Sequence, residues 1–437
     1  MQFLDELKWR GLLHQTTGGD ELQEHLATGS RIAYCGFDPT RDALTIGNYM
    51  PIKMLRHWQL AGHKPIVLMG GGTGLIGDPS GKDAERQLLS TEQVAKNIEG
   101  QLKSFSKVLD FEGENAAVIV NNADWLCELG FLDVLRDVGK YFSVNTMIQK
   151  DSVKDRLNNR EQGISYTEFS YMILQAYDFL HLRREMDCTI QIAGSDQYGN
   201  IVAGIDLIRR DIAGTDAGSI RGFGGAGITN PLVTASDGSK IGKTEDGAIW
   251  LDADRTSPYT FHQYWLNVPD EDAGKFLRWF TFLDQPTIEA IEIEHAQTPH
   301  QRAAQHALAD AMTELFHGEE NVVRCNEAAR ALFGGDISSL DEHMLGEVFA
   351  EVPAGKFAKD SLGTEAASLV ELLPQTELCN SKREAREFLQ NGSVAINGEK
   401  ISGDDAIDRV LTSDDLLHGS TILLRRGKKA WFASRWA

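Results

Sequence analysis

Short apolar runs alternate with amphipathic stretches through the first half of the chain. Four runs have the length and composition of buried strands, and they lie at 31–35, 65–69, 117–120 and 188–193. Stretches with the helical spacing of apolar residues lie between such runs, among others at 49–61, 91–108 and 131–139. This alternation predicts an α/β fold with a parallel sheet.

The segment from 31 to 62 is the most clearly patterned strand–turn–helix segment. Its apolar strand ends near Gly36, and an amphipathic helix begins at Tyr49. We place Pro51 in the first turn of that helix, where a missing N–H is tolerated. Together with the next strand, the segment forms a β-α-β unit whose cleft suits an anionic ligand.

The second half of the chain has a different pattern. It is mostly helical from about 256 to 350, and its last part reads as a small α+β module with a helix at 381–391. The predicted boundaries are an α/β domain at 1–250, a helical domain at 251–350, a linker at 351–366 and a final domain at 367–437.

Composition narrows the class of protein. The 437 residues are 42% hydrophobic and carry a net charge of −21, which argues against general coating of nucleic acid. The five cysteines are scattered, which indicates a reducing compartment and neither a disulfide framework nor a zinc site. We find no signal-peptide pattern and no apolar run long enough to span a membrane, so we expect a cytoplasmic enzyme with no membrane partner.

The charge balance reverses at the C-terminus. From residue 418 onward there are five lysines and arginines and no acidic residue. A local basic patch of this kind is what a specific RNA contact needs, although a solubilising tail would have the same composition. Apolar residues such as Ile422 and Trp431 favour packed strands over a free tail.

The glycine-rich segment Gly72–Gly77 fits the dinucleotide pattern G-x-G-x-x-G after a strand. That motif should open a helix, but here Asp78 and Pro79 follow at once. A tight strand-to-loop crossing is the alternative interpretation. An NAD-dependent enzyme therefore stays open as a hypothesis.

Ser165 to Glu168 match a capping box and predict the start of a helix. Along it Tyr171, Gln175 and Asp178 share one face, and such a polar stripe either satisfies a buried network or lines a small-ligand pocket. Further on, Asp196 follows the end of a strand, where an acid either accepts hydrogen bonds from a sugar or caps a helix.

Lys240, Lys243 and Thr244 lie in a loop that is rich in glycine, serine and aspartate. Two lysines beside a hydroxyl can surround a polyphosphate, and a mobile loop lets them engage as charge builds. An ordinary solvated loop is the commoner fate of a lysine pair.

The order of these motifs resembles that of bacterial-type tyrosyl-tRNA synthetases, which are class I aminoacyl-tRNA synthetases. The resemblance rests on YCGFDPT at 34–40, GGGTGLIGDPSGK at 70–82, TEFSYMILQAYDF at 167–179, GSDQYGN at 194–200 and KIGKT at 240–244. It implies a Rossmann-like catalytic domain, a helical anticodon-stem domain and an S4-like RNA-binding domain. It also implies tyrosine, ATP with Mg²⁺ and tRNA(Tyr) as substrates and partners, and a homodimer.

The resemblance implies residues for binding tyrosine, for binding ATP and for catalysis. Those implied for tyrosine are Tyr34, Asp38, Asp78, Asn122, Tyr171, Gln175, Asp178 and Gln197. Those implied for ATP are Gly36, Gly47, Asn48, Gly194, Asp196 and Lys243. Those implied for catalysis are Thr40, Thr45, Asn48, Lys82, Arg86, Lys240, Lys243 and Thr244.

One signature departs from the family. Its His-Ile-Gly-His segment reads Thr45-Ile46-Gly47-Asn48 here. We expect activity to be retained, because the Thr45 hydroxyl and the Asn48 amide can both donate to phosphate oxygens. The departure also motivates a rival hypothesis, an RNA-binding relative of this fold that does not activate amino acids.

Overall fold

The computed structural model describes residues 2–78, 89–150, 153–154, 157, 164–214, 222–238, 241–244, 247–332, 337–350, 352–402, 406–427 and 430–437. They form two compact units. The first unit is Met1–Thr256 with Asn267–Phe316, and the second unit is Ser257–Leu266 with His317–Ala437. No helix among the described residues is long and apolar enough to cross a membrane.

A six-stranded sheet forms the centre of the first unit, in the order β1-β6-β5-β2-β3-β4. Its strands are β1 (Gln15–Thr16), β2 (Ile32–Phe37), β3 (Lys64–Met69), β4 (Val118–Asn121), β5 (Ile190–Gly194) and β6 (Ala226–Asn230). All neighbours are parallel except β1, which pairs antiparallel with β6. The strand order reverses between β2 and β5, and ligands of such sheets bind at this switch point.

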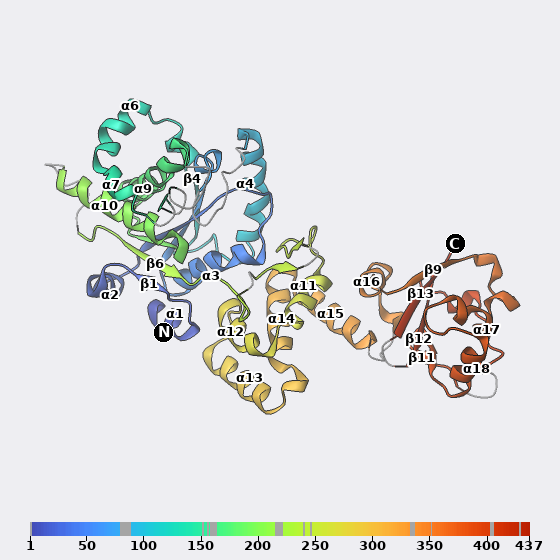
Figure 1. Ribbon diagram of the computed structural model, residues 1–437. Helices are drawn as coiled ribbons and strands as arrows, with labels where there is room; N and C mark the ends of the chain where they lie inside the picture. Colours follow the sequence, from blue (N-terminus) through green and yellow to red (C-terminus); the bar gives the residue numbers. More distant parts are fainter. Residues whose placement is uncertain are drawn as a thin grey trace. The chain divides into compact units, whose positions relative to one another are not determined.

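Helices cover both faces of this sheet, with α3 and α4 on one side and α9 and α10 on the other (Figure 1). The long helices before residue 256 are α1 (Phe3–Arg10), α2 (Gly19–Ala27), α3 (Ile46–Leu60), α4 (Thr91–Phe105), α9 (Tyr166–Met186) and α10 (Tyr198–Gly214). Shorter helical segments are α5 (Ala123–Leu126), α6 (Phe131–Asp133), the π-helix Val134–Val138 and α7 (Val144–Met147). Side chains of α9 and α10 pack on Tyr34, Ile66 and Leu68 of the sheet in one buried cluster.

The first unit also contains three helices that follow residue 266, namely α12 (Asp270–Phe280), α13 (Gln285–Gln297) and α14 (Ala303–His317). The predicted boundary at residue 250 therefore differs from the division in the structure. The α12 helix adjoins α3, because Tyr49 and Lys53 of α3 donate hydrogen bonds to carbonyl groups at the end of α12.

The second unit combines α11 (Pro258–Leu266), α15 (Glu319–Leu332) and α16 (Glu342–Val348) with a five-stranded sheet. The sheet order is β11 (Glu399–Lys400), β10 (Val394–Ile396), β12 (Thr421–Arg426), β13 (Ala430–Trp436) and β9 (Ala354–Phe357). The helices α17 (Leu369–Leu372) and α18 (Lys382–Gln390) pack with it in one apolar core. Because β9 pairs parallel with β13, the segment predicted as a linker at 351–366 contributes a strand.

Most predicted strands and helices are present, with shifted ends. The β6 strand, which follows a glycine-rich stretch, was not predicted. The α3 helix begins at Ile46, earlier than predicted, because Thr45 and Asn48 form a capping box at its start. Pro51 consequently lies inside the helix, so its placement in the first turn was wrong.

Candidate active site

The carboxyl ends of β2 and β5 and the start of α3 bring most of the described candidate residues to one edge of the sheet. Asp38 and Thr40 follow β2, Gly194 ends β5, and Asp196 and Gln197 form the short turn before α10. This edge is the switch point of the strand order, where the fold leaves room for a ligand.

One end of the site is a buried polar cluster around Asp178 of α9. Its Oδ2 atom accepts a hydrogen bond from Asn122 Nδ2 at 2.9 Å, and its Oδ1 atom accepts one from Trp125 Nε1 at 2.8 Å. The residue is 2% exposed, and this burial raises the pKa of Asp178 to about 7, although the two hydrogen bonds oppose the rise. Sequence reasoning missed Trp125, because nothing in a single sequence pairs it with residue 178.

Tyr34 of β2 lies beside this cluster. It is 1% exposed, and burial together with the nearby Asp178 charge raises the pKa of Tyr34 well above its usual value. Its hydroxyl group has no hydrogen-bond partner among the described residues. A buried hydroxyl without a partner is costly, so this position is suited to a ligand that supplies one.

Asn122 joins the cluster to the glycine-rich loop. Its Oδ1 atom accepts from the Gly72 N–H at 2.8 Å, and its Nδ2 atom also donates to Thr73 Oγ1 at 3.0 Å. A side chain on Gly71 would overlap Asn121, so the glycine is required by close approach. The segment forms a short 3-10 turn at Thr73–Leu75, and the helix that a dinucleotide motif needs does not begin within it.

A second polar cluster centres on Gln197. Its Nε2 atom donates to Asp78 Oδ2 at 2.7 Å, and its Oε1 atom accepts from Gln175 Nε2 at 3.2 Å and from Asn200 Nδ2 at 3.1 Å. Tyr171 lies one helical turn before Gln175 on the same helix and is buried. Asn200 of α10 was not predicted, although its position three residues after Gln197 was a usable signal.

Thr45 and Asn48 are bonded to each other at the start of α3. The Asn48 Oδ1 atom accepts from the Thr45 backbone N–H at 3.0 Å and from the Thr45 hydroxyl at 2.9 Å. The Asn48 Nδ2 atom has no hydrogen-bond partner among the described residues, and the side chain is exposed. The Asn48 Nδ2 group can therefore donate to a ligand. The Thr45 hydroxyl could do so only if its hydrogen bond to Asn48 Oδ1 broke.

The KIGKT segment lies against this helix start. The Ile46 N–H donates to Ile249 O at 3.1 Å, and the Ile249 N–H donates to Gly242 O at 2.9 Å. Gly242 has a φ of 80°, and a side chain on it would meet Ile46 and the Gly47 nitrogen. Lys82, Arg86 and Lys240 lie outside the described residues, as do the side chains of Lys243 and Thr244.

The α12 helix holds residues 234 and 236, which precede the KIGKT segment, and sequence reasoning missed this contact. Asp272 Oδ2 accepts from the Ser236 N–H at 3.1 Å and from its hydroxyl at 3.0 Å. Lys275 lies 2.8 Å from Asp272 Oδ1 and donates to Thr234 O at 3.2 Å. Burial raises the pKa of Asp272, but the bonds from Lys275 and Ser236 outweigh it and hold the pKa below its usual value.

The turn that carries Asp38 and Thr40 is held by α4. Asn97 Nδ2 donates to Pro39 O at 2.8 Å, and Gln101 Nε2 donates to Arg41 O at 2.8 Å. Both side chains are buried, so the turn has a fixed position relative to the sheet edge.

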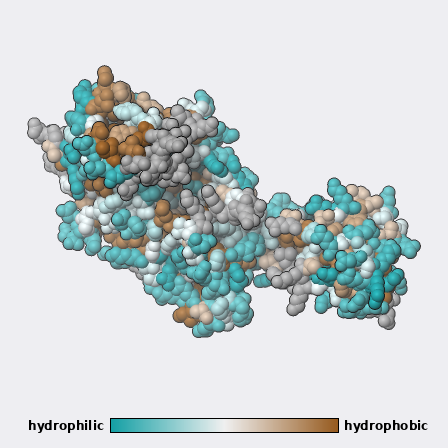
Figure 2. Space-filling view, viewed as in Figure 1, coloured by the Kyte–Doolittle hydropathy of each residue, from teal (hydrophilic) through white to brown (hydrophobic). Residues whose placement is uncertain are grey.

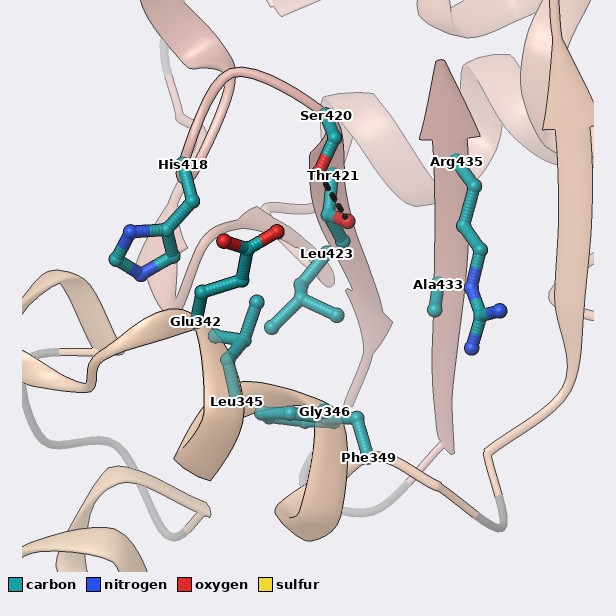
Figure 3. A pocket seen from close by; sticks show the side chains of 10 residues that line it. All are labelled: Glu342, Leu345, Gly346, Phe349, His418, Ser420, Thr421, Leu423, Ala433 and Arg435. Atoms are coloured by element: carbon teal, nitrogen blue, oxygen red, sulfur yellow. Dashed lines mark hydrogen bonds between the residues drawn. The ribbon is translucent and has the colours of Figure 1, made fainter. Parts of the chain in front are cut away.

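The second unit has a cavity of about 290 Å³ between α16, β12 and β13 (Figure 3). Its apolar lining includes Leu345, Phe349 and Leu423, and its polar lining includes His418 and Arg435. The predicted basic segment lies on the same sheet, although Lys428 and Lys429 are outside the described residues. The cavity is thus lined by the Glu342 carboxylate as well as by a cation and apolar side chains.

Comparisons with known proteins agree with this geometry. A family model for class I tRNA synthetases (W and Y) matches residues 27–334, and one for the tyrosine–tRNA ligase SYY-like C-terminal domain matches residues 345–434. The tyrosine–tRNA ligase of Staphylococcus haemolyticus is 46% identical over 429 residues, which are 98% of each chain. The chain belongs to the tyrosine–tRNA ligase family.

Other relatives place both units within this family. The tyrosine–tRNA ligase of Rhodopirellula baltica is 47% identical over 98% of this chain and 95% of its own. The crystal structure of a C-terminally truncated mitochondrial tyrosyl-tRNA synthetase from Aspergillus nidulans matches with a TM-score of 0.69 and 31% identity. That match covers 76% of this chain and 94% of the other. The predicted Rossmann-like fold and the family resemblance are thereby confirmed.

Proposed function

We propose that the protein is an ATP-dependent tyrosine–tRNA ligase that works in the cytoplasm. The observation that carries the proposal is the buried polar cluster of Tyr34, Asp178 and Asn122 at the switch point of the sheet. A phenol hydroxyl entering this cluster would donate to the Asp178 carboxylate and give the Tyr34 hydroxyl the partner that it lacks.

This cluster also accounts for specificity. A phenylalanine ring would leave the same buried groups without partners. Tyrosyl-tRNA synthetases are the standard example of such discrimination, and the factor of about 10⁵ against phenylalanine is a known property of the family. In this assignment Asp78, Tyr171 and Gln175 hold the substrate ammonium group. Gln197, which is already bonded to Asp78, orients the substrate near its carboxylate.

The first chemical step is the attack of a tyrosine carboxylate oxygen on the α-phosphorus of ATP. The bond from that phosphorus to the bridging oxygen breaks, and pyrophosphate leaves. No general base is needed because the carboxylate is already ionised, so catalysis depends on positioning and on charge at the departing phosphates. A terminal hydroxyl of tRNA(Tyr) then attacks the acyl carbon of the adenylate and displaces AMP.

The ATP end is assigned to the start of α3 and the end of β5. Gly36 and Gly47 let the nucleotide approach the backbone, Gly194 precedes the ribose-binding Asp196, and Asn48 donates to phosphate. Lys82, Arg86, Lys240, Lys243 and Thr244 supply the remaining donors and cations in the proposal. Mg²⁺ would arrive with ATP, held by phosphate oxygens.

The deciding experiment is ATP–pyrophosphate exchange with tyrosine, phenylalanine and tryptophan side by side. Exchange with tyrosine alone supports both the chemistry and the phenol-binding cluster. A folded protein that binds tRNA(Tyr) but gives no exchange with any of them would favour the RNA-binding relative. A thermal shift with NAD would revive the dinucleotide hypothesis.

We assign tRNA binding in part to the second unit. Arg435 is exposed beside the cavity of Figure 3, and Arg425 and Arg426 lie on the neighbouring strand β12. Deletion of the second sheet must begin before β9 at Ala354, because a cut near residue 360 would leave that strand behind. Such a deletion should spare exchange and weaken tRNA charging.

The proposal includes a homodimer. A patch of exposed apolar side chains lies on and around α6 and α7, where Figure 2 shows brown atoms gathered on the first unit. Its members are Phe131, Leu132, Leu135, Val144, Ile148 and Tyr166. Apolar patches of this kind commonly mark interfaces.

Sedimentation of the wild type and of Leu132→Asp tests the dimer. Leu132 is 77% exposed, so aspartate should not disturb the fold of a monomer but should break an interface. Leu60→Asp is the matched control, because Leu60 is 60% exposed and lies outside the patch. A monomeric wild type, or a dimeric Leu132→Asp protein, would contradict the assignment.

A further inference from the structure

The start of α3 lacks charge where the proposed reaction needs it. Thr45 and Asn48 stand where the family signature has two histidines, and neither side chain is ionisable. Pyrophosphate that leaves from this end of the site carries several negative charges, and cations near it lower the barrier. A nearby cation that sequence reasoning did not consider is Arg41.

Trp250 is in contact with both Thr45 and Arg41. Thr45 and Trp250 form an antiparallel bridge, flanked by the Ile46 N–H to Ile249 O and Leu251 N–H to Leu44 O bonds. Because these bonds join the flanking residues, Thr45 and Trp250 form a non-hydrogen-bonded pair. The two side chains of such a pair lie on the same face, with their Cβ atoms about 5 Å apart. The Arg41 guanidinium lies over the ring of this Trp250, 5.5 Å from the ring centroid.

A second arginine shows why Arg41 is the available cation. Arg255 also lies over the Trp250 ring, at 5.0 Å, but its guanidinium is ion-paired with Asp42. Arg41 is exposed and has no ion pair among the described residues. Its backbone is fixed by Gln101, which donates to Arg41 O at 2.8 Å, while its side chain is free to reach an anion.

We infer that Arg41 binds the phosphates of ATP at the start of α3 and supplies the positive charge that Thr45 and Asn48 lack. The inference rests on the proposed function. The Trp250 ring keeps the guanidinium near the site, since a cation over an indole face is attracted to it. The guanidinium's planar donors match phosphate oxygens when ATP arrives.

The test uses the full-length protein and tyrosine-dependent ATP–pyrophosphate exchange. Arg41→Ala should lower kcat/KM for ATP about tenfold and leave KM for tyrosine within about twofold, because the loss falls on charge at the phosphates. Arg41→Lys should recover part of the rate. Thr45→His should restore most of the activity of Arg41→Ala, since it returns a donor to the start of α3.

Arg278→Ala is the matched control. Arg278 lies over the Trp9 ring at 5.6 Å and is ion-paired with Glu292, so its removal changes a similar surface contact on another part of the first unit. Its exchange kinetics should equal those of the wild type. Arg41→Ala kinetics within about twofold of wild type would overturn the inference. A loss from Arg41→Ala that is as large in the Thr45→His background would overturn it as well.

Pyrophosphate binding separates this inference from the proposed function. Calorimetry of Mg²⁺-pyrophosphate binding needs no catalysis, so it gives a result even if the wild type shows no exchange. We expect Arg41→Ala to weaken this binding about tenfold, in line with the effect on exchange. Equal binding by wild type and Arg41→Ala would refute the role of Arg41, whatever the exchange assay shows.

Discussion

Asp178 provides a pH test of the proposed tyrosine site. Its carboxyl group is buried and has a pKa of about 7, so about one-tenth of the molecules carry the charge at pH 6 and about nine-tenths at pH 8. The ionised form is the acceptor that a phenol hydroxyl needs, since a charged acceptor makes the stronger hydrogen bond. The apparent Kd is the intrinsic Kd divided by the competent fraction, so tyrosine affinity should rise about tenfold from pH 6 to pH 8.

The measurement is tyrosine binding by calorimetry at several pH values, for the wild type and for Asp178→Asn. The variant should bind tyrosine weakly and without this pH dependence, because asparagine does not titrate. Ionisation of tyrosine itself affects both proteins equally and cancels in the comparison. A wild-type affinity that stays constant from pH 6 to pH 8, or the same slope in Asp178→Asn, would refute the role of the carboxylate.

The same pKa makes a stability prediction with a definite sign. The folded-state pKa is raised from 3.8 to about 7, so the folded protein holds a proton that the unfolded chain has released. The stability that this raised pKa contributes is fully present below pH 3.8. It falls by about 1.4 kcal/mol for each pH unit as the pH rises from 3.8 to about 7, where it is lost. The wild type should lose about 4 kcal/mol relative to Asp178→Asn between pH 4 and pH 8 in urea unfolding of the first unit.

Three further substitutions test other parts of the site. Tyr34→Phe should raise KM for tyrosine between about twofold and tenfold. It should not lower the melting temperature, because the Tyr34 hydroxyl has no partner among the described residues, and a clear loss of stability would contradict this. Asp272→Ala should lower kcat for exchange several-fold at unchanged KM for tyrosine. Glu292→Ala should not, because it removes only the ion pair to Arg278 at the far end of α12. Arg435→Gln should spare exchange and reduce the salt dependence of tRNA(Tyr) binding by about one counterion, measured by filter binding from low to high salt.

Local signals in the sequence were enough to predict the helix that carries the tyrosine site. Ser165 accepts from the Glu168 N–H at 3.2 Å, as the capping pattern predicted. The spacing of Tyr171, Gln175 and Asp178 placed their side chains on one helical face. Capping and periodicity depend on residues a few positions apart, so a single sequence contains the information.

Partners distant in sequence could not be predicted in this way. Trp125 donates to a residue 53 positions away, and Ser236 bonds to a residue 36 positions away. The chemistry of each side chain allows many partners, and only the packed sheet and helices select one. The β9 strand was missed for a similar reason, because its short stretch becomes a strand only by pairing with β13.

The α12 helix shows what this limit means for mechanism. Its N-terminal turn holds Ser236, which precedes the KIGKT segment, through Asp272, while carbonyl groups at its end accept from Lys53 of α3 at 2.6 Å and 3.0 Å. Lys53 is 0% exposed, and burial lowers its pKa well below the usual value. An amphipathic pattern would place such a lysine in solvent, yet here it ties the helix bearing Thr45 and Asn48 to the helix that anchors the loop. The start of α3 and the chain just before the KIGKT segment are thus both bonded to α12, so the spacing of the two segments depends on residues that touch neither substrate in the proposed site.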